Sequence, residues 1–191
     1  GMSECSPRIT TSDFSELHKY SNGRLIGVDE VRCVDGEIQV KGDATMLGYY
    51  NNEEATAAAF TSDGWLRTGD MGIFDRKDNL YIKGRCKNMI LTGNGQNIYP
   101  EEIEDKINNL PYVVESLVVG RKNAIVALVV ADYEAGKKAG IDAEALNKLI
   151  NDNVLALNPE LASYSKISST EIRSEAFDKT PKQSIKRYLY S

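Results

Sequence analysis

Residues 84–104 read GRCKNMILTGNGQNIYPEEIE, and the organisation of the whole chain is best understood from this segment. It places an arginine at the end of a strand, followed by a second short strand, a Gly-Asn-Gly loop and a helix that begins at Pro100. Glycine permits backbone with positive φ and close approach of a ligand, and a guanidinium offers planar donors to hydroxyl or phosphate oxygens. The pattern indicates a ligand-binding loop. An ordinary strand–loop–helix connection with a surface arginine stays open as the alternative.

The residues before this segment predict short strands and one helix. The alternation over residues 37–41 predicts a half-buried strand with Gln39 on its polar side. Asn51 is placed to cap a short helix that continues to about residue 60. Residues 72–75 and 80–83 predict two strands joined as a hairpin. We expect residues 1–86 to be a β-rich piece from the edge of a larger, missing domain.

The residues after it predict a compact domain of their own. We expect helices over residues 100–109 and 142–157. Between them, two apolar β-rich runs over residues 113–131 predict a second hairpin, and residues 165–172 predict a further strand. The domain over residues 87–191 is therefore expected to be a small sheet with flanking helices. Strands and helices do not alternate regularly, so the fold class is α+β.

The composition excludes several classes of function. The chain has 191 residues and a formal net charge of −5, so it has no electrostatic reason to bind nucleic acid. Cys5, Cys33 and Cys86 are scattered, which favours a reducing compartment over a disulfide framework or a zinc site. The single histidine, His18, excludes a His-rich metal cluster. Because no apolar run reaches membrane-spanning length and no signal peptide is recognisable, we expect a cytoplasmic protein without a transmembrane segment.

A second segment, Asp63-Gly-Trp-Leu-Arg-Thr-Gly-Asp70, also carries polar groups suited to a ligand. A carboxylate after a Thr-Gly turn can accept two hydrogen bonds from a ribose diol. The alternative is a solvated turn in which Asp70 caps the local backbone.

In this order, the two segments resemble the AMP-forming adenylating enzymes, which include acyl-CoA synthetases, luciferases and the adenylation domains of peptide synthetases. The sequences GWLRTGD, IKGRCKNMI and GQNIYPEEIE resemble the ribose-binding, hinge and CoA-loop motifs of that superfamily. GEIQVKG and MLGYYNNEEAT resemble the preceding stretch, and residues 1–4 resemble the end of its YGxTE motif. The resemblance covers nearly the whole chain. In detail, the sequence most resembles bacterial long- and medium-chain fatty acyl-CoA synthetases.

The resemblance implies a reaction and its ligands. A fatty acid and ATP give acyl-AMP and pyrophosphate, and coenzyme A then gives acyl-CoA and AMP, with Mg²⁺ bound to the nucleotide. Asp70 would hold the ribose hydroxyls of ATP or AMP, with Arg85 also at the ribose. Ser3 would meet the α-phosphate and Glu4 the magnesium ion.

The resemblance also implies a moving domain. Lys87 falls at the hinge about which the C-terminal domain rotates. After rotation, the loop that contains Gly93, Gly95 and Asn97 would line the tunnel for the pantetheine of coenzyme A. One small domain would in this way serve two half-reactions, and closure would keep water from the acyl-adenylate.

The chain departs from the family pattern near its C-terminus. The family places an adenylation lysine in a K-T-x-x-G-K-I-x-R type segment, and the matching run here is KTPKQSIKR over residues 179–187. Ser184 stands at the lysine position. The charge that develops at the α-phosphate would lose its ammonium unless Lys182 or Lys186 substitutes. The sequence does not choose between these two lysines, and a solvated basic tail remains the alternative.

The phosphate loop and the acyl pocket of the family are also not found, and we expect them upstream of Gly1. We therefore expect the isolated chain to be inactive, with its partner the missing N-terminal domain of the same enzyme. Without that domain, we expect residues 1–86 either to be poorly ordered or to cover their bare apolar surface through crystal or dimer contacts. The alternatives in function are a non-catalytic remnant that binds a nucleotide or a partner, and the adenylation domain of a peptide synthetase.

Overall fold

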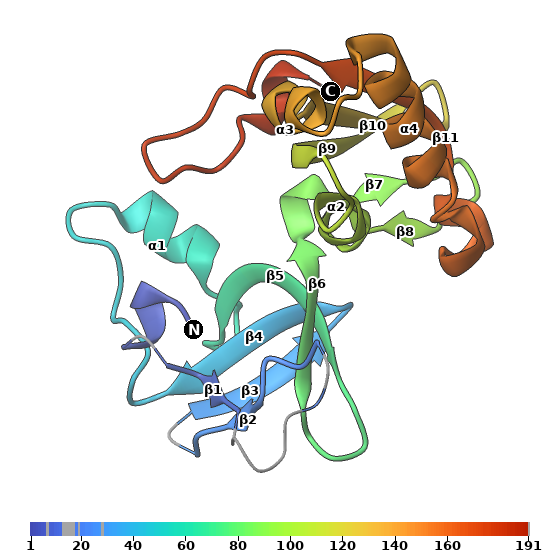
Figure 1. The fold of residues 1–191 in the computed structure, drawn as a ribbon. Helices are drawn as coiled ribbons and strands as arrows, with labels where there is room; N and C mark the ends of the chain where they lie inside the picture. The colour runs from blue at the N-terminus through green and yellow to red at the C-terminus, as the bar shows by residue number, and fades with distance from the viewer. Residues whose placement is uncertain (7, 13–17, 19, 28, 191) are drawn as a thin grey trace. The chain divides into compact units, whose positions relative to one another are not determined.

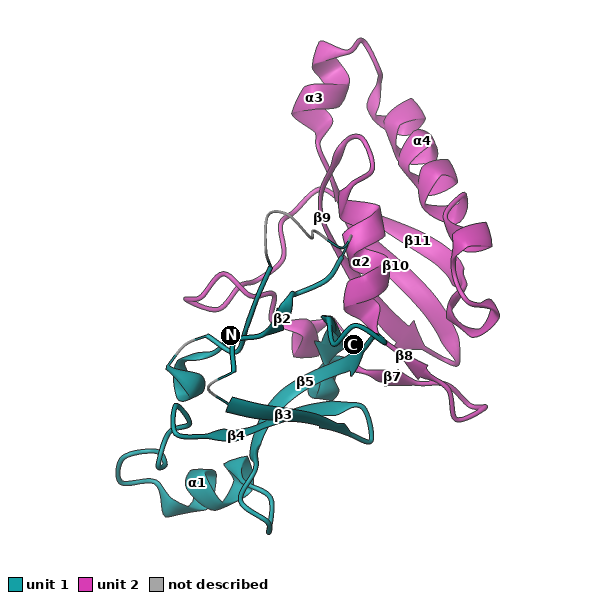
Figure 2. Cartoon of the chain, turned by 90° about the horizontal axis from the view of Figure 1, so that it is seen from below, with its two compact units in different colours: residues 1–88 teal, residues 89–191 magenta. Residues whose placement is uncertain are grey.

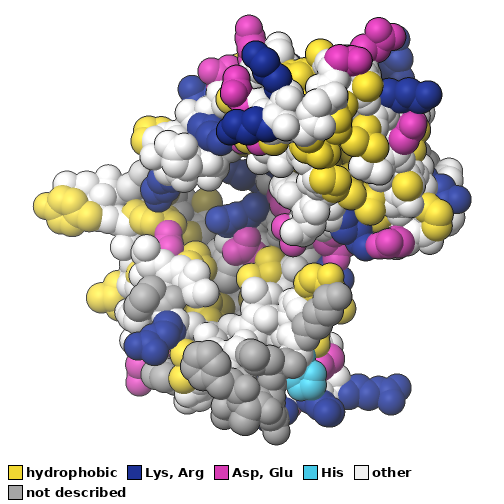
Figure 3. Space-filling view, in the orientation of Figure 1, with side chains coloured by type: hydrophobic (Ala, Val, Ile, Leu, Met, Phe, Trp, Pro, Cys, Tyr) yellow, Lys and Arg dark blue, Asp and Glu magenta, His cyan; other side chains and the backbone are white. Residues whose placement is uncertain are grey.

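The computed structural model describes residues 1–6, 8–12, 18, 20–27 and 29–190. The chain forms two compact units, Gly1–Asn88 and Met89–Ser191 (Figure 2). Small sheets and short helices occur in both (Figure 1), so the fold is mixed α+β as the sequence predicts. None of the helices in the described part of the chain has the length and apolar character needed to cross a bilayer. Figure 3 shows acidic and basic side chains interspersed on one face.

The first unit is built on an antiparallel four-stranded sheet with strand order β3-β4-β5-β6. Its elements, with 3₁₀ helices labelled η, are η1 (Ser3–Cys5), β1 (Thr10–Thr11), β2 (Arg24–Leu25), β3 (Asp29–Val34), β4 (Glu37–Gly42), α1 (Glu53–Ala59), β5 (Leu66–Phe74), β6 (Leu80–Arg85) and η2 (Cys86–Asn88). Its small core forms around the buried Cys5, Val40 and Leu66.

Two sequence-based expectations for this unit need correction. The helix cap is Asn52, whose side chain accepts a hydrogen bond from the Ala55 amide at 2.9 Å, and Asn51 instead has a positive φ of 50°. Gln39 does not face solvent, since only 3% of its surface is exposed. The side chain stays on the polar face of β4 but is covered there, because Arg32 donates to its amide oxygen at 2.8 Å.

The predicted hairpin of β5 and β6 is present, but β5 begins earlier than expected. Thr68, Gly69 and Asp70 belong to this strand and do not form a separate turn. On β4, Glu37 and Gln39 pair with Met71 and Arg67, so β5 has two more residues than β4 over this stretch. Such an insertion is a β-bulge, and bulges redirect side chains near functional sites. The bulge is the structural feature that determines where Asp70 lies.

The second unit has a three-stranded sheet with the order β11-β10-β9, in which β10 runs antiparallel to β9 and parallel to β11. Its elements are β7 (Ile90–Leu91), β8 (Asn97–Ile98), α2 (Pro100–Asn108), β9 (Val113–Arg121), β10 (Ala124–Ala131), α3 (Tyr133–Lys138), α4 (Ala143–Leu155), η3 (Asn158–Glu160), η4 (Ser163–Ser165), β11 (Ile167–Arg173) and η5 (Arg187–Leu189). The expected helices, hairpin and final strand are all confirmed within a few residues, and the short helix α3 was not predicted.

Both faces of this sheet are covered. Helices α2 and α4 bury Ile103, Ile107, Leu146, Ile150 and Val154 against one face. The C-terminal segment covers the other face through Phe177, with Ile185 and Tyr190 packed beside it. All but the first residue of β10 are therefore buried, which explains its continuous apolar run. On α4, Val154 is fully buried, whereas Leu149 is 36% exposed.

Candidate functional site

Asp70 and Arg85 are cross-strand partners on β5 and β6. The Nε atom of Arg85 lies 3.1 Å from Oδ1 of Asp70, and the side chains are 54% and 26% exposed. The pair is thus formed within the sheet but remains accessible to a ligand. A carboxylate has two acceptor oxygens and a guanidinium has five donors, so both retain capacity for further hydrogen bonds.

The local hydrogen bonds of the bulge fix the backbone around Asp70. The Thr68 hydroxyl donates to the carbonyl oxygen of Ile38 at 2.7 Å and accepts from the Asp70 amide at 3.1 Å. Gly69 between them has a φ of +70°, a conformation that glycine adopts without steric cost. Arg85 also donates to the Thr68 carbonyl at 3.4 Å.

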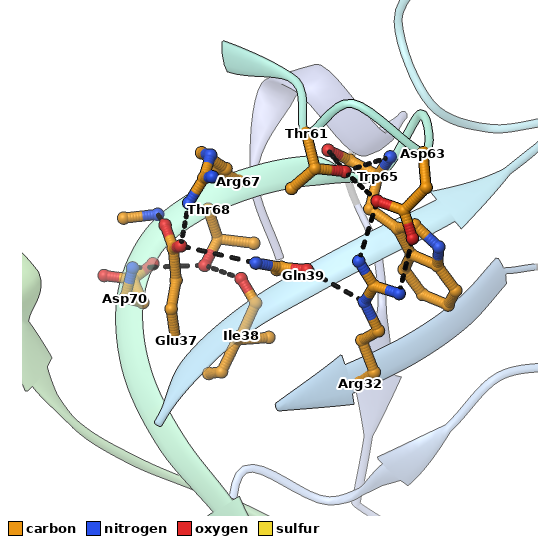
Figure 4. Close-up of polar contacts among 11 residues, drawn as sticks. Arg32, Glu37, Ile38, Gln39, Thr61, Asp63, Trp65, Arg67, Thr68 and Asp70 are labelled. Carbon is orange, nitrogen blue, oxygen red and sulfur yellow. Dashed lines mark hydrogen bonds and ion pairs between the residues drawn. The ribbon is translucent and has the colours of Figure 1, made fainter. Parts of the chain in front are cut away.

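Glu37 is a residue near this site that sequence reasoning did not select. Its carboxylate accepts hydrogen bonds from the Arg67 guanidinium at 2.9 Å and from the Gly69 amide at 3.3 Å (Figure 4). The alternating pattern of β4 assigns Glu37 to a solvated face. No local signal reveals a contact across the sheet to a bulge that the sequence did not predict.

Ser3 and Glu4 lie on η1 in the same unit. Ser3 is exposed. Glu4 accepts a hydrogen bond from the Tyr49 hydroxyl at 3.2 Å, and burial together with this carboxylate raises the pKa of Tyr49. Within the residues that the structure describes, no group of three His, Cys, Asp or Glu side chains could hold a metal ion.

Lys87 is exposed on η2, directly after the Asp70–Arg85 pair and one residue before the last residue of the first unit. The neighbouring Cys86 is half-buried. Burial, together with the nearby carboxylates of Glu37 and Asp70, raises the pKa of the Cys86 thiol. This residue has none of the features of an activated nucleophile.

The glycine loop follows β7 and precedes α2, as the sequence predicts, but a second short strand, β8, which was not predicted, lies between the loop and the helix and pairs with β7. The loop closes through hydrogen bonds from Thr92 N to Gln96 O at 3.0 Å and from Gly95 N to Thr92 O at 2.9 Å. Gly95 has a φ of +75°, and a Cβ atom added at Gly93 or Gly95 would meet nothing within 4 Å. The loop therefore presents exposed backbone with open space around it.

The segment 179–187 forms a tight hairpin with an isolated bridge between Lys179 and Ile185. The Gln183 amide donates to Thr180 O at 2.9 Å, and Gln183 has a positive φ of 62° at the turn. This places Lys182 and Ser184 at an exposed tip. The chain on both sides of the bridge is paired, since Thr180 N donates to Ser184 O and Lys186 N donates to Asp178 O, both at 2.8 Å.

Two other cations of this segment are engaged within the second unit. Lys179 pairs with Glu115 at 2.6 Å, and Arg187 pairs with Glu104. Lys182 and Lys186 form no ion pair within the described part of the chain. They are therefore the two lysines of this segment that remain available to an anion.

Residues 87–190 match the family of the AMP-binding enzyme C-terminal domain. The chain belongs to this family. It is 39% identical over 137 residues to long-chain-fatty-acid–CoA ligase FadD15 of Mycobacterium bovis. This alignment covers 71% of this chain and 23% of the relative. It is 42% identical over 127 residues to 2-succinylbenzoate–CoA ligase of Listeria innocua. That alignment covers 65% of this chain and 27% of the relative.

The fold matches the same group of adenylate-forming CoA ligases. O-succinylbenzoate coenzyme A synthetase from Bacillus subtilis, solved with AMP, superposes with a TM-score of 0.78 at 28% identity, over 100% of this chain and 39% of that one. The chain spans about a quarter of the length of the curated relatives it matches. The candidate residues of this chain are divided between its two units. The first unit contains Ser3, Glu4, Asp70, Arg85 and Lys87, and the second contains the glycine loop and the hairpin of residues 179–187, here called the basic hairpin.

Proposed function

We propose that this chain is the C-terminal part of an ATP-dependent, AMP-forming fatty acid–CoA ligase. The observation that carries the proposal is the cross-strand pair of Asp70 and Arg85, separated by 3.1 Å and partly exposed. The Asp70 carboxylate fits the two hydroxyls of a ribose, and Arg85 supplies donors beside it. Fatty acids are the favoured substrate class because a relative at 39% identity is a long-chain-fatty-acid–CoA ligase.

The remaining roles in the first unit follow the order of the motifs. Ser3 contacts the α-phosphate through its exposed hydroxyl. Glu4 contributes one carboxylate to a Mg²⁺ ion whose other ligands are phosphate oxygens and water. The Tyr49 hydroxyl, 3.2 Å from Glu4, orients that carboxylate.

The second unit serves both half-reactions in this proposal. The basic hairpin delivers an ammonium, from Lys182 or Lys186, to the charge that develops at the α-phosphate. Rotation about Lys87 then replaces the hairpin with the loop of Gly93, Gly95 and Asn97, whose exposed backbone lines the path of the coenzyme A thiol. Sequential presentation of the two faces keeps water from the acyl-adenylate.

The substrate is tested on the longer protein that includes the upstream sequence. We expect ATP–pyrophosphate exchange that depends on added long-chain fatty acid, and release of AMP when coenzyme A is also present. The isolated 191-residue chain is expected to give no exchange. Exchange driven by an aromatic or short dicarboxylic acid, with none from fatty acids, would contradict the substrate class and leave the CoA-ligase assignment intact.

The nucleotide site is tested on the isolated chain by NMR titration with AMP. We expect weak binding, with shifts at the amides of residues 67–71 and 84–86. Asp70→Ala should abolish these shifts because the acceptor for the ribose hydroxyls is lost. Asp43→Ala, which removes an exposed carboxylate elsewhere in the first unit, serves as the matched control. Equal shifts in both variants would remove Asp70 from the site.

A further inference from the structure

A carboxylate of the neighbouring strand contacts the bulge that carries Asp70, in addition to the Thr68–Ile38 hydrogen bond. Glu37 of β4 accepts one hydrogen bond from the Gly69 amide at 3.3 Å and one from the Arg67 guanidinium at 2.9 Å. These donors lie on the β5 segment from Arg67 to Met71 that contains the two inserted residues. The carboxylate therefore contacts Gly69, the residue directly before Asp70, and Arg67, three residues before Asp70.

Glu37 is itself fixed by a chain of polar contacts on the same face of the sheet (Figure 4). The buried amide of Gln39 donates to Glu37 at 3.5 Å and accepts from Arg32 at 2.8 Å. Arg32 forms two hydrogen bonds with Asp63, at 2.8 and 3.0 Å, and lies 4.3 Å over the Trp65 ring. A bidentate pair of this kind has a defined geometry. The orientation of Glu37 is thus set by contacts remote from Asp70.

The position of Glu37 favours a specific role over general stabilisation. Its side chain is 17% exposed, so its hydrogen bonds compete little with water. The acceptor is ionised, and hydrogen bonds from backbone amides to carboxylates are stronger than neutral ones. The bonded amide belongs to Gly69, which has a φ of +70°. Glycine has many other accessible conformations, so a contact that holds its amide selects this one.

We propose that Glu37 is a positioning residue that sets the place of Asp70 beside Arg85. The carboxylate holds the Gly69 amide, the bulge keeps its inserted residues on β5, and the Asp70 side chain consequently meets Arg85 across the strand pair. The nature of the ligand rests on the proposed function, whereas the positioning of the pair does not. Glu37 acts through Asp70 and makes no contact with the nucleotide.

The first arm of the test uses the 191-residue chain without ligand. In Glu37→Ala we expect the Gly69 amide to exchange with solvent about tenfold faster, and the Arg85 Nε–H signal to move toward that of a solvated arginine. Glu37→Gln retains an acceptor oxygen and should keep both signals closer to the wild type. Arg67→Gln is the matched control, because it removes another partner of Glu37 and leaves the Gly69 contact in place.

The second arm repeats the AMP titration on the same proteins. We expect Glu37→Ala to weaken AMP binding about tenfold and Glu37→Gln to restore most of it, with urea unfolding showing an intact sheet in both. Unchanged Gly69 and Arg85 signals in a folded Glu37→Ala protein would overturn the inference. So would wild-type AMP affinity in that variant. If the wild-type chain binds no AMP, the proposed function fails, and the first arm alone decides the role of Glu37.

Discussion

Glu104 of α2 and Arg187 near the C-terminus form an ion pair across the second unit. The same carboxylate accepts a hydrogen bond from the Val118 amide of β9 at 2.6 Å. Burial raises the pKa of Glu104, and the charge of Arg187 opposes that shift in part. One buried side chain therefore joins the helix after the glycine loop, the sheet and the basic hairpin.

Glu104→Ala should destabilise the second unit by about 3 kcal/mol, because it removes the acceptor of the Val118 amide and the nearer of the two carboxylates that Arg187 contacts, with Glu101 at 3.7 Å. Glu104→Gln should cost less, since its amide oxygen can still accept from Val118. Chemical denaturation, followed by a probe in the second unit, measures both. Asp105→Ala, which removes an exposed carboxylate on the same helix, is the control and should change stability by less than about 0.5 kcal/mol. Equal losses for Glu104→Ala and Asp105→Ala would contradict this role.

The turn between β5 and β6 should confer a pH dependence on the first unit. Asp75 accepts hydrogen bonds from the side chain and backbone of Asn79, and these contacts lower its pKa from 3.8 to about 2. Since the folded pKa lies below the ordinary value, the stabilisation is fully present above pH 3.8 and is lost as the pH falls through 2. NMR titration of the carboxyl carbon should give a midpoint near 2.

Asp75→Asn is the corresponding variant. It should flatten the dependence of stability on pH between 4 and 2, because the group that gains a proton in this window is gone. A carboxyl midpoint at the ordinary value of 3.8 in the wild type would show that the turn does not hold Asp75 as described.

Most elements of the second unit were predictable because their signals are local. Pro100 marks the start of α2, and the Asp142 side chain caps α4 by accepting from the Ala145 amide at 2.8 Å. The apolar runs of β9 and β10 reflect a sheet covered on both faces. The short helix α3 has a cap of the same kind, since the Asp132 side chain accepts from the Ala135 amide at 2.8 Å, but its six residues, YEAGKK, include a glycine and no apolar stripe.

The first unit was harder to predict because its key features depend on contacts across the sheet. The segment around Asp70 was expected to form a turn from its Thr-Gly pair, whereas pairing with β4 and β6 draws it into a bulged strand. The Asp70–Arg85 contact was expected from the resemblance to a family. The predicted hairpin of residues 72–75 and 80–83, extended outward, also places residue 70 opposite residue 85. Glu37 was missed because its contacts with β5 cross the sheet to a bulge that the sequence did not predict.

Lys87→Pro tests the proposed hinge in the longer protein. Proline fixes φ and removes a backbone donor, so it should restrict rotation at this position. We expect the first half-reaction, followed by ATP–pyrophosphate exchange, to change less than threefold, and thioester formation to slow at least tenfold. Lys87→Ala keeps the backbone free and should spare both steps. Equal loss of both half-reactions in Lys87→Pro, with a normal Lys87→Ala, would argue against a hinge.

The final prediction concerns the ammonium that we propose replaces the family lysine. Lys179 and Arg187 are held by Glu115 and Glu104, so two lysines of the basic hairpin remain. Lys182 occupies the exposed tip, whereas Lys186 is half-buried and its amide donates to the Asp178 carbonyl at 2.8 Å. The tip has the greater reach toward a phosphate, and we therefore expect Lys182 to supply the charge.

In the longer protein, Lys182→Ala should slow ATP–pyrophosphate exchange about 100-fold, the usual cost of removing one group that stabilises developing charge. Thioester formation from preformed acyl-adenylate should be unchanged, because in the proposed mechanism that step uses the other face of the domain. Lys186→Ala should cost less than tenfold. Adding Ser184→Lys to the Lys182→Ala protein restores a lysine at the family position and should recover most of the lost exchange. A large loss in Lys186→Ala with a normal Lys182→Ala would assign the role to Lys186, and loss in neither would show that this hairpin does not act on the phosphate.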